Sequence, residues 1–149
     1  MDRVLDKADR GPTWLKQPRV ARCVRDALEF GERQLKLYSL IAYAIMPNHV
    51  HVVVSPKTGL PRITKSIKGF TARKANAILG RTGEPFWQDE SYDHWVRNEG
   101  ELQKIIGYVE RNPVSAGLVE KIEEWPWSSA YTGKNACATV TAAGAGCCR

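Results

Sequence analysis

The sequence predicts an α+β fold, in which helices pack on a small antiparallel sheet. Two observations lead to this expectation. Apolar residues recur at helical spacing in three separate segments, residues 18–31, 62–79 and 98–112. Between the first two segments lie two runs rich in β-branched and aromatic residues, separated only by the turn dipeptide Pro47–Asn48. The expected order is therefore helix, strand, strand, helix, strand, helix, within a single domain.

The first helix is expected over residues 18–31, because its apolar residues share one face. These residues are Val20, Cys23, Val24, Ala27 and Leu28. Gly31 marks the expected end of this helix, because glycine is common just past a helix C-terminus.

Strands are expected over residues 35–46, "LKLYSLIAYAIM", and over residues 49–54, "HVHVVV". The short turn between them predicts an antiparallel hairpin. A third strand is expected at the end of residues 86–97, "FWQDESYDHWVR", after a loop.

The helix over residues 98–112 has the clearest boundaries. Asn98 is the expected N-cap, and Glu101 three residues later completes a capping-box pattern. Its apolar stripe consists of Leu102, Ile105, Ile106 and Val109. Pro113 disfavours helical geometry at Asn112, so the helix is expected to end or bend there.

Composition excludes several classes of protein. With 43% hydrophobic and 26% charged residues, the chain has the composition of a globular domain. It contains no apolar run of the roughly 18 residues that a membrane span needs and no start typical of a signal peptide. We therefore expect a cytoplasmic protein without a membrane partner. The four cysteines show no metal-finger spacing.

The last residues differ from the rest. Residues 132–149, "TGKNACATVTAAGAGCCR", have small side chains and no periodicity. We expect this segment to be a disordered tail, which leaves residues 1–131 as one domain.

Positive charge is concentrated in the second predicted helix and its flanks. Between Lys57 and Arg81 there are seven Lys or Arg residues and no Asp or Glu, whereas the whole chain has a net charge of +6. Such a cluster indicates a surface that contacts phosphates. A basic helix face that contacts only solvent is an equally good explanation of the charge taken alone.

Two of the three histidines fall in the second predicted strand. Side chains alternate across a strand, so His49 and His51 should lie on one face, and Val50, Val52 and Val54 on the other. Imidazoles at this spacing can converge on one cation. Two hydrogen-bonded or half-exposed histidines are the commoner outcome for an isolated His-x-His pattern.

The helix over residues 98–112 offers further polar groups. Tyr108 and Asn112 are four residues apart, so they are neighbours at the edge of the apolar stripe. An Asn amide oxygen is a ligand suited to Mg²⁺ or Mn²⁺, and a Tyr hydroxyl beside a metal-bound phosphate can act as a nucleophile. Taken singly, Tyr108 is more typical of a tyrosine at a packing interface.

These residues occur within motifs that carry a family resemblance. The run "MPNHVHVVV", followed later by "IIGYVERNPVSAGL" and "WPWSSAY", resembles the single-tyrosine HUH transposases. It is most similar to the REP-associated tyrosine transposases of bacteria. The similarity extends from about Gly11 to Tyr131 and includes "LPRITKSIKGFTARKAN" and "PFWQDESYDHWVR".

The resemblance implies a ferredoxin-like antiparallel sheet and a metal-dependent, site-specific single-stranded DNA endonuclease and strand transferase. His49, His51 and Asn112 would match the ligands of Mg²⁺ or Mn²⁺. Tyr108 would match the nucleophile, which forms a 5′-phosphotyrosine link at hairpin-associated sites without a nucleotide cofactor. The basic residues Arg62, Lys65, Lys68, Arg73 and Lys74 would contact DNA, and the protein would be a monomer or a homodimer.

One departure from this family is visible. The family's first strand precedes the first helix, but here only "MDRVLDKADR" precedes the turn "GPTWL". We therefore expect the N-terminal strand to be missing, which leaves three strands and an open sheet edge.

Two alternatives to the enzyme remain open. One is a hairpin-binding module that does not cleave, and the other is a histidine-metal nuclease that uses water, in which Tyr108 is structural.

Overall fold

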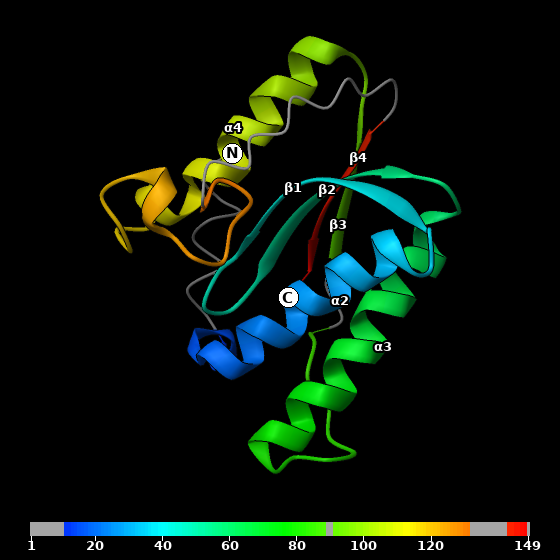
Figure 1. Cartoon of the computed structure of the whole chain (residues 1–149), viewed down its shortest axis with the longest axis vertical. Helices are drawn as coiled ribbons and strands as arrows, with labels where there is room; N and C mark the ends of the chain where they lie inside the picture. The colour runs from blue at the N-terminus through cyan, green and yellow to red at the C-terminus, as the bar shows by residue number, and fades with distance from the viewer. Residues whose placement is uncertain (1–10, 89–90, 132–142, 149) are drawn as a thin grey trace.

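The computed structural model describes residues 11–88, 91–131 and 143–148. In these ranges the elements are η1 (Trp14–Lys16), α2 (Pro18–Arg33), β1 (Tyr38–Ile45), β2 (Val50–Pro56), α3 (Leu60–Leu79), β3 (Ser91–Val96), α4 (Glu99–Ser115), η2 (Ile122–Glu124) and β4 (Ala143–Cys148). Figure 1 shows α4 on one side of the sheet and α2 and α3 on the other. The predicted α+β class with an antiparallel sheet is confirmed.

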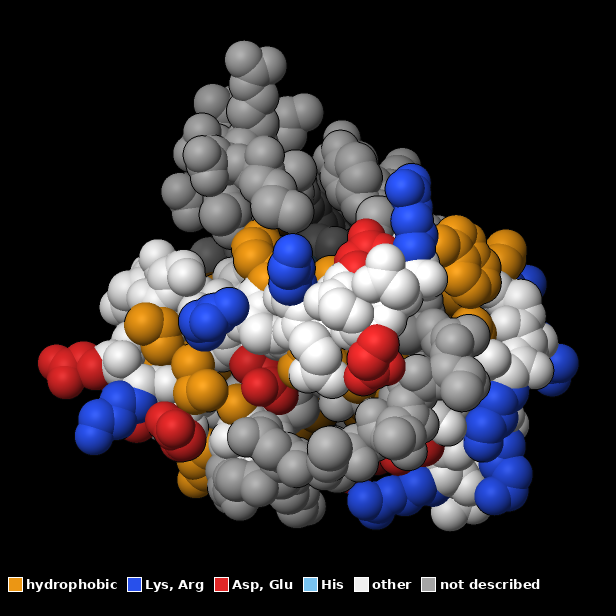
Figure 2. Space-filling model, turned by 90° about the horizontal axis from the view of Figure 1, so that it is seen from above, with side chains coloured by type: hydrophobic (Ala, Val, Ile, Leu, Met, Phe, Trp, Pro, Cys, Tyr) orange, Lys and Arg blue, Asp and Glu red, His pale blue; other side chains and the backbone are white. Residues whose placement is uncertain are grey.

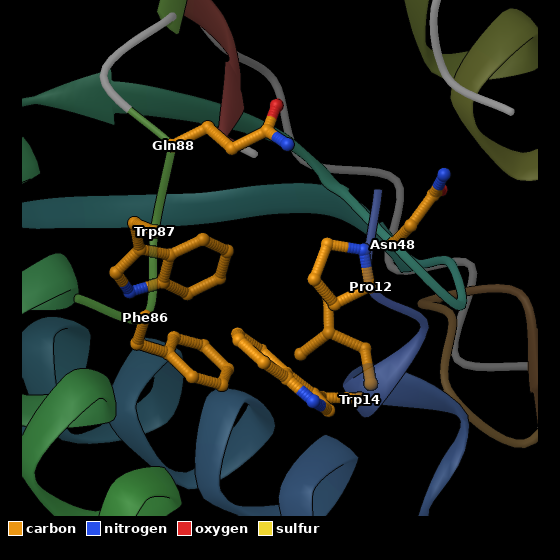
Figure 3. Close-up of a pocket in the computed structure, with 7 residues that line it drawn as sticks. Pro12, Trp14, Asn48, Phe86, Trp87 and Gln88 are labelled. Carbon is orange, nitrogen blue, oxygen red and sulfur yellow. The ribbon is translucent and has the colours of Figure 1, made fainter. Parts of the chain in front are cut away.

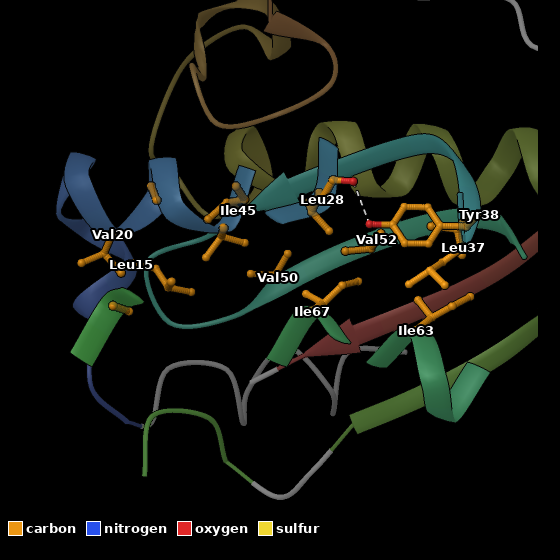
Figure 4. Packing of buried hydrophobic residues seen from close by; sticks show 14 residues of the cluster. Leu15, Val20, Leu28, Leu37, Tyr38, Ile45, Val50, Val52, Ile63 and Ile67 are labelled. Atoms are coloured by element: carbon orange, nitrogen blue, oxygen red, sulfur yellow. Dashed lines mark hydrogen bonds between the residues drawn. The ribbon is translucent and has the colours of Figure 1, made fainter. Parts of the chain in front are cut away.

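Two hydrophobic clusters hold the layers together. One cluster lies between α2, α3 and the face of the β1–β2 hairpin that these helices cover (Figure 4). Its members include Val20, Leu28, Ile45, Val50, Val52, Val54, Ile63 and Ile67. On the opposite face, Leu102 and Val109 of α4 pack with Ala42, Ala44, Met46 and Val53. The valines at even positions of β2 thus face α2 and α3, and the odd positions face α4, as the strand period predicts.

Gly31 does not end the first helix. It lies inside α2, which continues to Arg33, and an added Cβ at Gly31 would lie 2.4 Å from the hydroxyl oxygen of Tyr38. That hydroxyl donates a hydrogen bond of 2.7 Å to the carbonyl of Leu28 (Figure 4). Glycine is therefore required here for close packing against β1, and the expectation of a stop at this position is wrong.

Pro113 does not end α4 either. The helix runs through Pro113 to Ser115. Pro113 is fully buried, and the amide of Ala116 still donates to the carbonyl of Asn112. Because only the last turn of the helix follows the proline, the missing backbone hydrogen bond affects the end of the helix and not its middle.

The C-terminal segment contradicts its expected disorder where it is described. Residues 143–148 form β4, which lies between β2 and β3 in a four-stranded sheet of order β1-β2-β4-β3. Val53 pairs with Ala145, and Ala145 also pairs with His94 on the other side. The sheet therefore has four strands and not three, and β4 occupies the place beside the histidine strand that was expected to be open. Residues 132–142 and 149 lie outside the described ranges.

The segment after η2 covers part of the edge strand β1. The amide of Ile45 donates to the carbonyl of Trp127, and the amide of Ser129 donates to the carbonyl of Tyr43. The indole N–H of Trp125 donates to the carbonyl of Ile45 at 3.0 Å. These bonds explain the run "WPWSSAY" structurally, because they protect backbone groups that an edge strand would expose.

Among the helices of the described ranges, none is long and apolar enough to cross a membrane.

Candidate functional site

The two histidines lie where the hairpin turn meets β2, on the face that α4 covers. Asn48 and His49 belong to the turn that joins β1 to β2, and the amide of Met46 donates to the carbonyl of His49 across this turn. His51 lies within β2. Only 5% of the His49 surface and 8% of the His51 surface are exposed. The alternating pattern thus places both imidazoles on one face, as predicted.

Three side chains converge at this point. The Nε2 atoms of His49 and His51 are 3.0 Å apart, and the amide Nδ2 of Asn112 lies 3.1 Å from Nε2 of His51. Asn112 is 3% exposed. Residues from a turn, a strand and a helix therefore meet in a small, almost dry volume.

Hydrogen-bonding distances link the polar side chains of this cluster. Nδ1 of His49 lies 2.7 Å from Oδ1 of Asn48, and since an amide oxygen can only accept, the imidazole N–H donates in this contact. Nε2 of His51 lies 3.0 Å from Nε2 of His49 and 3.1 Å from the amide of Asn112. Asn48, His49, His51 and Asn112 therefore form one continuous polar cluster.

The donor set could hold a divalent cation, because an imidazole nitrogen of His49 and the side-chain amide of Asn112 lie 3.0 and 3.1 Å from Nε2 of His51. Half a turn of the Asn112 amide puts its oxygen in place of its nitrogen. Within the described residues, no group of three His, Cys, Asp or Glu side chains is placed to hold a metal, so an Asn would have to supply the third protein ligand.

Tyr108 lies beside this cluster. Its ring centroid is 5.9 Å from that of His51, with the rings nearly perpendicular. The side chain is 38% exposed, so one side contacts the cluster and the other is open to solvent. Tyr108 and Asn112 are on successive turns of α4 and reach the same place, as their spacing predicts.

A hydrogen-bond network holds α4 over the sheet. The hydroxyl of Ser129 donates to Oε1 of Glu110 at 3.1 Å and accepts from the amide of Tyr43 at 3.0 Å. It thereby links α4 to β1. Burial raises the pKa of Glu110, an effect that the Ser129 hydrogen bond partly offsets. At the N-terminus of α4, Asn98 accepts from the amide of Glu101 at 2.9 Å, which is the predicted cap.

The predicted DNA-binding residues lie elsewhere. Arg62, Lys65, Lys68, Arg73 and Lys74 are all on α3, and α3 covers the opposite face of the sheet from α4. All except the half-buried Lys68 are exposed. On the face shown in Figure 2, Lys and Arg side chains are interspersed with Asp and Glu. The structure therefore groups the histidines with Tyr108 and Asn112 but does not bring the basic helix to them.

Two features were missed from the sequence. Asn48 was interpreted only as a turn residue, although its place next to His49 was a signal for a side-chain contact. Trp14 was not connected with Phe86 and Trp87, because it is far from that pair along the chain. The side chain of His94, the third histidine of the chain, lies outside what the structure describes.

The chain matches a family and several relatives. Residues 18–112 match the model of the family described as "Transposase IS200 like". A candidate REP-associated tyrosine transposase of Haemophilus influenzae is 28% identical, with 62% of this chain and 58% of that protein covered. The REP-associated tyrosine transposase of Escherichia coli strain K12 is 22% identical, with 62% and 54% covered. The chain thus spans little more than half the length of these two relatives.

A solved structure has the same fold. It is described as a REP-associated tyrosine transposase bound to a REP hairpin, and it superposes with a TM-score of 0.61 at 20% identity, covering 81% of this chain and 70% of that one. The family match includes both histidines, Tyr108 and Asn112 and extends over more than half of the sequence. The chain belongs to the IS200-like transposase family.

Proposed function

We propose that this chain is a metal-dependent, site-specific endonuclease and strand transferase that acts on single-stranded DNA beside hairpins. The observation that carries the proposal is the convergence of His49, His51 and Asn112 next to the half-exposed ring of Tyr108. Membership of a transposase family supports the reaction class. The relative that is bound to a REP hairpin supports the class of DNA.

Tyr108 is the proposed nucleophile. Its hydroxyl oxygen attacks the phosphorus of a phosphodiester, and the bond between phosphorus and the 3′-oxygen breaks. The 5′-phosphate stays on Tyr108, while the other strand leaves with a free 3′-OH. The phenol loses one proton to solvent and the departing 3′-oxygen gains one, so no nucleotide cofactor is consumed. A new 3′-OH can reverse the step and join strands, because the covalent link retains the energy of the broken bond.

His49, His51 and Asn112 would hold Mg²⁺ or Mn²⁺ next to this hydroxyl. When bound, the ion would polarise the scissile phosphate and offset its developing negative charge. Asn48, whose Oδ1 lies 2.7 Å from Nδ1 of His49, would orient that ring from behind, as a partner of a metal ligand does. All of these side chains belong to one chain, so a monomer is sufficient to form the site.

Two other functions make different predictions. A hairpin-binding module would shift the mobility of DNA without cutting it. A nuclease that activates water would cut DNA but leave no protein attached. The two hypotheses differ from the proposal in whether a covalent adduct forms, and not in whether DNA binds.

The test uses hairpin DNA with single-stranded flanks, labelled at the 5′ end in one sample and at the 3′ end in another. With Mn²⁺ present, the proposal predicts that the label becomes attached to denatured protein only when it is on the 3′ side of the cut. The other cleavage product then has a free 3′-OH. Cleavage that leaves both products free of protein would contradict the tyrosine mechanism, and binding without any cleavage would favour the module.

A further inference from the structure

A pocket lined by aromatic rings includes Asn48, the residue that precedes His49 (Figure 3). We call it the aromatic pocket, and it is lined by Pro12, Trp14, Leu15, Asn48, Phe86, Trp87 and Gln88. The rings of Trp14 and Phe86 are stacked with centroids 5.4 Å apart. Phe86 and Trp87 meet edge to face at 5.0 Å. All three rings are only partly buried, so each retains surface that a ligand can cover.

Both walls of the aromatic pocket are fixed by hydrogen bonds. The indole N–H of Trp87 donates to the Thr71 hydroxyl on α3 at 2.8 Å. On the other wall, the amide of Leu15 donates to the carbonyl of Pro47 in the turn before His49. The pocket is therefore built from segments that are anchored to the sheet and to α3, and its rings are held in place before any ligand binds.

The position of the aromatic pocket connects two surfaces that are otherwise separate. Asn48 lines the pocket and also accepts from the His49 ring. At the other end, the carbonyl of Gln88 accepts from the Lys68 ammonium on the basic helix at 3.5 Å. A strand that passes from the histidine site to α3 by this route crosses the aromatic pocket.

The chemistry of the lining suits a nucleobase. Flat aromatic faces stack on any base. The Gln88 amide has both donors and an acceptor for a base edge, and the Asn48 amide keeps its NH₂ donors, since its oxygen contacts His49. The Arg81 guanidinium lies 4.5 Å over the Trp14 ring, so positive charge is present for the phosphate that a base carries with it. The pocket has a cavity volume of only about 20 Å³, so a base would stack across its mouth and not be enclosed.

We infer that the aromatic pocket binds one unpaired base of the single strand that flanks the scissile phosphate. Stacking on Trp14, Phe86 or Trp87 would hold this nucleotide and so position the neighbouring phosphate at the histidine site. The inference rests on the proposed function for the identity of the ligand, and it adds a binding site for a base, which none of the metal ligands or the nucleophile supplies.

Binding measurements with abasic DNA test this inference without requiring cleavage. The probe is a hairpin with a single-stranded flank, in which one nucleotide at a time lacks its base. For the parent protein, one position should lower the affinity by roughly 5- to 150-fold, as expected from stacking worth about 1–3 kcal/mol per base. The variants Trp14→Leu and Phe86→Leu should lose affinity for intact DNA and lose no more when that base is absent.

The matched control is Trp95→Leu, since Trp95 is 58% exposed and does not line the aromatic pocket. It should bind intact DNA like the parent. Gln88→Ala, which changes an exposed side chain at the pocket end, serves as a second probe if a ring variant does not fold, and it should weaken binding only when the base is present. The inference is overturned if no flank position responds, or if each variant weakens intact and abasic DNA equally.

Failure of this inference can be told apart from failure of the proposed function. A covalent adduct with no base-dependent position would leave the proposed function standing and remove the base site. A flank position whose base contributes to binding, found without any covalent adduct, would leave the base site standing and remove the proposed function.

Discussion

Nε2 of His51 lies 3.1 Å from the side-chain amide of Asn112, although 61 residues separate them in the sequence. The contact exists because α4 packs on β1 and β2 through Leu102 and Val109, which brings the last turn of the helix over the start of β2. The candidate site therefore depends on the docking of one helix on one hairpin.

Removing any of the three proposed ligands should weaken metal binding. His49→Ala, His51→Ala and Asn112→Ala should each lower the affinity for Mn²⁺ by at least about 10-fold. A bound ion stabilises the folded state by about 2.7 kcal/mol at 100 times its Kd, so the parent should show a rise in Tm with Mn²⁺ that the variants lack at the same concentration. EDTA should stop cleavage and leave hairpin binding intact.

Gln103→Ala is the control for these substitutions, because it changes an exposed side chain of α4. It should retain the rise in Tm with Mn²⁺. Full cleavage in EDTA, or an unchanged metal response in His49→Ala, would contradict the assignment of the site.

The basic helix should bind phosphates at a distance from the histidine site. Replacing Lys65, Lys68 and Arg73 with Glu should weaken hairpin binding strongly. It should also reduce the slope of log K against log salt by about 0.7 for each single-strand phosphate that the variant no longer neutralises. The control reverses Lys16, Lys36 and Lys121, which are also exposed but lie outside α3. An unchanged slope in the α3 variant would mean that other residues bind the phosphates.

Glu110 should make stability depend on pH. Burial raises the pKa of its carboxyl in the folded state, so the folded chain favours the protonated form. This contribution to stability is fully present below the ordinary glutamate pKa of about 4.3 and is lost as pH rises through the raised pKa. The difference in Tm between Glu110→Gln and the parent should therefore grow in favour of the variant from acid to neutral pH. A difference that does not change with pH would show that Glu110 is not perturbed.

The strand β4 should be necessary for stability, because it has neighbours on both sides. Ala145→Pro removes a backbone donor from the middle of this strand and should destabilise the fold by about 1–3 kcal/mol, or about 2–12 °C in Tm. The matched variant Ala145→Gly keeps the donor and adds no side-chain atoms, so it should melt closer to the parent than the proline variant does. Equal melting of the proline variant and the parent would mean that β4 does not pair in solution.

The sequence predicted the structure correctly where the regular spacing of side chains along one strand or one helix determines which of them share a face. Alternation along residues 49–54 correctly separated His49 and His51 from the valines, and the four-residue spacing of Tyr108 and Asn112 correctly placed them together. The cap at Asn98 was also correct, since it depends on neighbours within one turn. In each case the interaction is local, and residue type and spacing are sufficient to predict it.

Other features could not be predicted because they depend on contacts between distant segments. Gly31 resembles a helix stop until the Tyr38 hydroxyl is seen against it. The run "AGAGCC" has weak strand propensity, and only the unfilled position between β2 and β3 makes it a strand. The aromatic pocket is assembled from residues that are widely separated along the chain, and no local pattern connects them.

The most direct test of the proposed mechanism is to measure the yield of covalent adduct for the Tyr108→Phe variant. This substitution removes one hydroxyl group and keeps the ring beside His51, so hairpin affinity should stay within a few-fold of the parent. The yield of protein attached to labelled DNA should fall by about 10⁴-fold or more, to background, as expected when a nucleophile is removed. The control is Tyr131→Phe, since Tyr131 is 42% exposed and lies outside α4. This variant should form adduct like the parent. Adduct formation by Tyr108→Phe at near the parent rate would contradict the account.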